Sequence, residues 1–100
     1  MSFDEWRESI GRDKAPPRGS SLALQALWHD AHGDWECAHN VAQDDKGRDG
    51  SWVHAYLHRK EGDLANAGYW YARAGRAAPA PKVGLAEEWA EIARTLFGRG

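Results

Sequence analysis

The sequence predicts a small all-α domain, and three observations support this prediction. Two Gly-Asp pairs, Gly33-Asp34 and Gly62-Asp63, each match the end of one helix and the N-cap of the next. No segment alternates apolar and polar residues with the period of two that marks a half-buried strand. Six tryptophans among 100 residues, with a net charge of −2, supply enough apolar surface for one folded core.

The N-terminal part is expected to be a short helix followed by a linker. Apolar residues recur at helical spacing over residues 1–10, and Ser2 with Glu5 forms a capping-box pair. The next segment contains two prolines and two glycines and no bulky apolar side chain, which is typical of a linker. We therefore expect residues 1–20 to form this helix and linker, and residues 21–100 to form a helical domain.

Five further helices follow from capping residues, glycine stops and apolar stripes. Serine or aspartate precedes four of them, and the fifth carries an apolar stripe that begins at Leu85. We expect these helices at about 22–32, 35–44, 51–61, 63–76 and 85–97. Ser51 is the predicted N-cap of the third, and the segment between the second and third reads as a polar loop.

An internal repeat relates the second and third helices to the fourth and fifth. At an offset of 29 residues, small, imidazole and turn residues coincide. The matched pairs are Ala26/Ala55, His29/His58, Gly33/Gly62, Asp34/Asp63 and Ala38/Ala67. Glycine permits a left-handed corner, aspartate caps the helix after it, and alanine allows close helix approach. The sequence therefore predicts two tandem antiparallel helix hairpins, with helix 85–97 covering the open end.

The second unit resembles a tetratricopeptide repeat. In HAYLHRKEGDLANAGYWYARAGRAAP, residues 54–79, small and turn residues stand at that motif's spacing. The run from Ala67 to Ala74 also resembles the A-x-x-W-Y-x-K-A segment of Sel1-like repeats, and the first unit matches less well. The chain as a whole resembles a group of small bacterial proteins. The resemblance implies paired helices whose first members line a concave groove for a peptide or partner protein.

Six residues are candidates for contacting such a partner. They are Trp52, Tyr56, Arg59, Lys60, Trp70 and Arg73. The resemblance implies that the first four face the groove from helix 51–61, where aromatic area and an arginine fork suit a peptide or acidic ligand. The alternative is that Trp52 and Tyr56 are core residues of a helix packed on several sides. Trp70 either packs on the next helix or belongs to a contact surface.

Three histidines are candidates for a metal site. His54 and His58 are four residues apart on one expected helix and share a face, and His39 lies on the helix before it. Three imidazoles with Glu61 nearby could hold zinc or iron. The alternative is structural, with half-buried imidazoles that hydrogen-bond to neighbouring side chains.

Several classes of function find no support in the sequence. No nucleophile motif, Gly-rich phosphate loop or apolar run of membrane-spanning length occurs, and the near-neutral charge argues against nucleic-acid binding. The single Cys37 excludes an internal disulfide, so we expect a cytoplasmic protein. The leading prediction is a binding module without catalysis that recognises a peptide or protein through helix 51–61. A metal site and a structural homo-oligomer, such as a homodimer, are the alternatives.

Overall fold

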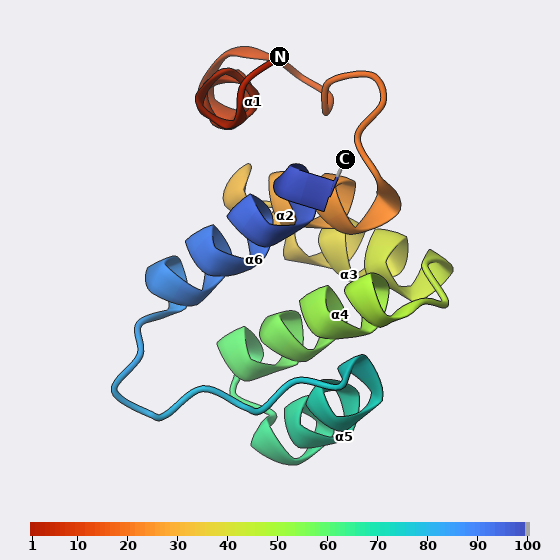
Figure 1. Cartoon of the computed structure of the whole chain (residues 1–100), viewed down its shortest axis with the longest axis vertical. Helices are drawn as coiled ribbons and strands as arrows, with labels where there is room; N and C mark the ends of the chain where they lie inside the picture. The colour runs from red at the N-terminus through yellow and green to blue at the C-terminus, as the bar shows by residue number, and fades with distance from the viewer. Residues whose placement is uncertain (100) are drawn as a thin grey trace.

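The computed structural model describes residues 1–99 and shows a purely helical chain (Figure 1). No strand occurs among these residues. The six helices are α1 (Phe3–Arg12), α2 (Leu22–Ala31), α3 (Trp35–Asp44), α4 (Arg48–Glu61), α5 (Leu64–Ala74) and α6 (Leu85–Arg99). None of the helices in residues 1–99 combines the length and hydrophobicity needed to cross a membrane. The prediction of an all-α chain is therefore confirmed.

Most helix starts follow from the capping residues in the sequence. Side-chain oxygens accept a backbone N–H in the first turn of four helices, at Ser2, Ser21, Asp34 and Asp63. At Ser2 the Glu5 carboxylate accepts a hydrogen bond from the backbone N–H of Ser2 itself, which completes the expected capping box. These bonds satisfy amide groups that a helix end leaves unpaired.

The two Gly-Asp corners have the same backbone geometry. Gly33 and Gly62 both adopt φ of +92°, a left-handed conformation that glycine takes without steric cost. The N–H of the following aspartate donates to the carbonyl of the histidine five residues earlier, at 2.9 Å in the first corner and 3.0 Å in the second. This bond is typical of a Schellman ending and turns each second helix back along the first.

The start of α4 differs from the prediction. The helix begins at Arg48, and Ser51, the expected N-cap, is buried within it. Gly47 is the N-cap, and no side chain caps this helix. The Asp45 Oδ1 accepts the N–H of Gly47 at 2.8 Å in the turn that leads into the helix. A Cβ at Gly50 would lie 2.4 Å from the Asp45 carbonyl oxygen, so the turn closes only because residue 50 has no side chain.

Gly50→Ala is therefore expected to destabilise the protein by about 2 kcal/mol or more, since an overpacked methyl group has to displace backbone atoms. Gly68→Ala is the matched control. It lies inside α5, a Cβ there meets nothing within 4 Å, and alanine favours helix over glycine by about 1 kcal/mol. Urea unfolding should show the two variants moving in opposite directions; a tolerated Gly50→Ala would contradict the tight turn.

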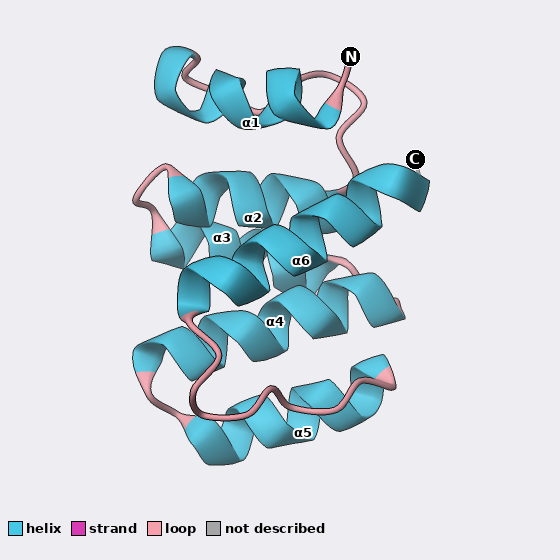
Figure 2. Cartoon of the chain, turned by 60° about the vertical axis from the view of Figure 1, so that its left-hand side comes forward, coloured by secondary structure: helices cyan, strands magenta, loops and turns pink. Residues whose placement is uncertain are grey.

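The helices form a layered stack crossed by α6. α2 packs against α3, α3 against α4, and α4 against α5, while α6 packs across α2 and α4 (Figures 1 and 2). α1 joins the same core, since Trp6 is buried and its ring lies 6.1 Å from that of Trp89 in α6. The expected boundary at residue 20 therefore does not divide the hydrophobic core.

Buried polar groups fix α6 in this position. The carboxylate of Glu88 in α6 accepts from Arg59 at 2.9 Å and from the Tyr71 hydroxyl. The guanidinium also donates to the Val83 carbonyl, in the segment that leads into α6. Burial is the main factor that raises the pKa of the Tyr71 hydroxyl, which remains a donor. Arg59 thus binds both α6 and its connecting segment.

Candidate functional site

Three imidazoles meet between α3 and α4. His39 comes from α3, whereas His54 and His58 lie one turn apart on α4. One ring nitrogen from each lies within 4.8 Å of the others, and the Nε2 atoms of His39 and His54 are 3.0 Å apart. Ring centroids are separated by 4.6 to 5.1 Å in the three pairs. The three histidines selected from sequence therefore converge, and we call them the histidine cluster.

Two tryptophans stack on members of the histidine cluster. The Trp35 ring stacks on His39 at 5.0 Å, and the Trp70 ring stacks on His54 at 4.0 Å. The Trp35 indole N–H donates to the Leu57 carbonyl at 3.0 Å, which fixes its ring against α4. Because a flat ring stacks on each of these two imidazoles, packing sets the orientation of their nitrogens.

Burial keeps two members of the cluster neutral. Desolvation is the main factor that lowers the pKa of His54, to about 4, with further contributions from His39 and His58. Desolvation also lowers the pKa of His39, and the neighbouring His58 adds to the effect. At neutral pH, one of these two rings donates to the other through the Nε2 pair. The neutral imidazole is the form that ligates metals.

These shifts predict that the metal-free protein loses stability in mild acid. In the unfolded chain His54 takes up a proton near pH 6.5, whereas in the folded chain it does so only near pH 4. The unfolded state therefore binds more protons between these values, and stability falls as the pH drops from 6.5 to 4. The loss from His54 should reach about 3 kcal/mol, since one pKa unit corresponds to 1.36 kcal/mol. Urea unfolding at pH 7.5, 5.5 and 4.5 measures it.

His54→Gln is the reference for this prediction. The variant lacks the imidazole, so its stability should fall less steeply than that of the original protein over the same interval. Equal slopes in the two proteins would show that His54 does not carry the pH dependence.

The third imidazole is oriented by a carboxylate. Nδ1 of His58 lies 2.6 Å from the Glu61 carboxylate, so that nitrogen carries the proton and donates it. This leaves Nε2 as the acceptor, and the Asn66 side-chain nitrogen lies 3.4 Å from it. A histidine that donates its other N–H to a carboxylate is the usual arrangement of a metal-binding imidazole.

Trp52 and Tyr56 are buried on α4. Trp52 is 5% exposed and Tyr56 only 2%, so neither presents an open aromatic surface. The prediction that they face a groove is wrong, and the alternative that placed them in the core is correct. The Tyr56 hydroxyl donates to the buried Asp30 carboxylate at 3.1 Å, and the Arg76 guanidinium lies 3.8 Å above the Trp52 ring. α6, which packs across α2 and α4, lies beside Tyr56, whereas Arg76 covers Trp52.

The other four candidate binding residues divide into two groups. Arg59 and Lys60 are held by buried carboxylates, through Glu88 at 2.9 Å and Asp30 at 2.9 Å. Trp70 is half-buried against the histidine cluster, and Arg73 is exposed beside it with its guanidinium 5.2 Å above the Trp70 ring. The structure therefore does not bring the six candidates onto one surface.

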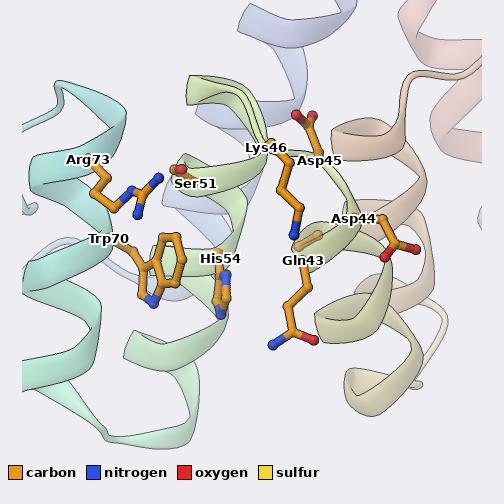
Figure 3. Close-up of a pocket in the computed structure, with 9 residues that line it drawn as sticks. Gln43, Asp44, Asp45, Lys46, Ser51, His54, Trp70 and Arg73 are labelled. Atoms are coloured by element: carbon orange, nitrogen blue, oxygen red, sulfur yellow. The ribbon is translucent and has the colours of Figure 1, made fainter.

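A pocket of about 410 Å³ opens beside the histidine cluster (Figure 3). Its walls come from the end of α3, the loop that follows, α4 and α5. The lining residues are Ala42, Gln43, Asp44, Asp45, Lys46, Ser51, His54, Trp70 and Arg73. The sequence does not predict Lys46 and Ser51 as pocket residues, because Lys46 lies in an expected polar loop and Ser51 is an expected helix cap. The 29-residue repeat does not indicate a binding role for either residue.

No family model, curated protein or solved structure matches the chain. The resemblance to tetratricopeptide and Sel1-like repeats therefore stays a prediction.

Proposed function

We propose that the protein binds a divalent transition metal ion through His39, His54 and His58. The convergence of three ring nitrogens within 4.8 Å carries this proposal. Tetrahedral ligands about 2.0–2.1 Å from a metal ion lie about 3.4 Å from one another. The nitrogens are 3.0 Å apart in the His39–His54 pair and within 4.8 Å overall, so side-chain shifts of about 1 Å would bring all three to that spacing. The ion would replace the hydrogen bond between His39 and His54 with two coordinate bonds.

Zinc is one of the ions that this donor set suits. Three imidazoles without a thiolate or a carboxylate in direct contact suit zinc, and they also suit copper, nickel and iron. Three protein ligands leave a coordination position open, which distinguishes binding or catalytic zinc sites from closed structural ones. Glu61 supports the set from outside, since its bond to the N–H at Nδ1 of His58 leaves Nε2 as the nitrogen with a free lone pair.

The repeat architecture supplies the frame for this site. We propose that α2–α3 and α4–α5 are two units of a tetratricopeptide-like array, and the matching Gly33 and Gly62 corners support this. The histidine cluster lies where the second helix of one unit packs on the first helix of the next. Peptide binding through residues 51–61 is less well supported, because α6 already packs on α4.

Metal analysis of the untagged protein tests the proposal. Incubation with Zn²⁺ followed by desalting should leave about one equivalent bound, and calorimetric titration of the metal-free protein should show one site. His32→Gln is the control, because His32 is exposed and stacks on Trp28 outside the histidine cluster. It should bind zinc like the original protein. Less than a tenth of an equivalent of zinc on the original protein would contradict the proposal. So would a loss of zinc in His32→Gln as large as the loss in a variant that lacks one of the three cluster histidines.

A further inference from the structure

The pocket beside the histidine cluster has two positively charged side chains that face it. Arg73 from α5 and Lys46 from the loop after α3 extend toward the space between them (Figure 3). Within residues 1–99, neither forms an ion pair with a carboxylate. The Arg73 guanidinium donates to the Tyr69 hydroxyl at 3.2 Å, which leaves most of its N–H groups for a ligand.

The acidic residues of the pocket do not neutralise these cations. The carboxylates of Asp44 and Asp45 point away from the space that Arg73 and Lys46 face (Figure 3). Asp45 is also engaged, since its Oδ1 accepts the N–H of Gly47. The pocket therefore presents its positive charge inward, which favours an anionic guest.

The other walls of the pocket determine what the part of the ligand away from Arg73 and Lys46 would contact. His54 and Trp70 line the pocket together, and the Ser51 hydroxyl adds a further polar group. His54 belongs to the histidine cluster, so this wall carries one of the three proposed metal ligands. A volume of about 410 Å³ is within the range of small-molecule sites.

We propose that this pocket binds a small dicarboxylic acid, with one carboxylate held by Arg73 and Lys46 and the other at the open position of the metal. The second contact rests on the proposed metal site, whereas the first does not. A guanidinium fork pairs with a carboxylate through two parallel N–H donors, and a carboxylate oxygen is a good ligand for zinc.

Calorimetric titration of succinate into the metal-free and the zinc-loaded full-length protein tests the two contacts separately. Succinate should bind the metal-free protein weakly and the zinc-loaded protein at least tenfold more tightly. Acetate has one carboxylate and should bind more weakly than succinate to the zinc-loaded protein. Inorganic phosphate is the third probe, and its binding as tightly as succinate would overturn the assignment to dicarboxylic acids.

Arg73→Gln should weaken succinate at least tenfold in both forms of the protein and leave zinc affinity unchanged. Lys82→Gln is the matched control, because this exposed residue does not line the pocket. Unchanged succinate affinity in Arg73→Gln, or no succinate binding to a protein that does bind zinc, would overturn the proposal. Succinate binding through Arg73 in a protein that fails to take up zinc would confirm the anion contact and refute the metal contact.

Discussion

Replacing His54 with glutamine is expected to lower zinc affinity more than about a hundredfold, since loss of an outer-shell partner alone costs 10–100-fold. His54 has one ring nitrogen 3.0 Å from His39 and sits in the same cluster as His58, so its removal leaves two ligands from different helices. Competition with a zinc indicator measures the affinity at neutral pH. The same loss is expected for His39→Gln, whose side chain is less buried.

Two comparisons keep this result interpretable. Circular dichroism and urea unfolding should show that both variants stay folded, so that the loss concerns ligands and not the fold. Glu61→Gln should cause a smaller loss, because the amide can still accept from Nδ1 of His58. If His54→Gln and His39→Gln fold and retain zinc affinity within threefold, the histidine cluster is not the site.

Glu88→Ala is expected to destabilise the protein by about 3–5 kcal/mol, the usual cost of removing one partner of a buried ion pair. The Glu88 side chain is 5% exposed and that of Arg59 is 13% exposed. Truncation leaves the guanidinium with the Val83 carbonyl alone and deprives the Tyr71 hydroxyl of its acceptor. Because this network joins α6 to α4 and α5, the loss should appear as a lower midpoint of urea unfolding.

The neighbouring Glu87 provides the matched control. Its carboxylate is exposed and, among residues 1–99, accepts only from the Gly84 N–H, at 3.4 Å, so Glu87→Ala should change stability by less than about 0.5 kcal/mol. The loss of stability in Glu88→Gln should lie between those of Glu88→Ala and Glu87→Ala, since the amide oxygen can still accept from the Tyr71 hydroxyl. A cooperative transition of Glu88→Ala at the original midpoint would contradict the role of this network.

Local interactions explain why the helices could be predicted from sequence. Three helices are capped by side chains that accept the N–H of the residue three positions later, at Ser2, Asp34 and Asp63. Two helices end at glycines in the left-handed conformation that favours glycine, Gly33 and Gly62. The start of α4 was missed because its determinant, the fit of Gly50 against Asp45, depends on a packed turn.

The candidate site was predictable in part. His54 and His58 share a face by helical spacing, and the expected packing of α3 on α4 is what adds His39 to them. The groove prediction failed because it depended on which residues cover Trp52 and Tyr56, and these contacts join segments far apart in the sequence. The bond from Trp89 to the Leu27 carbonyl spans 62 residues, and no periodicity reveals such a partner.

X-ray absorption at the zinc K-edge of the zinc-loaded protein identifies the ligands of the bound ion. We expect a first shell that contains three imidazole nitrogens at about 2.0 Å, with the outer-ring scattering typical of histidine. One water oxygen should complete the shell, and succinate should replace it. A first shell of carboxylate or water oxygens with fewer than two imidazoles would contradict a metal site on the histidine cluster.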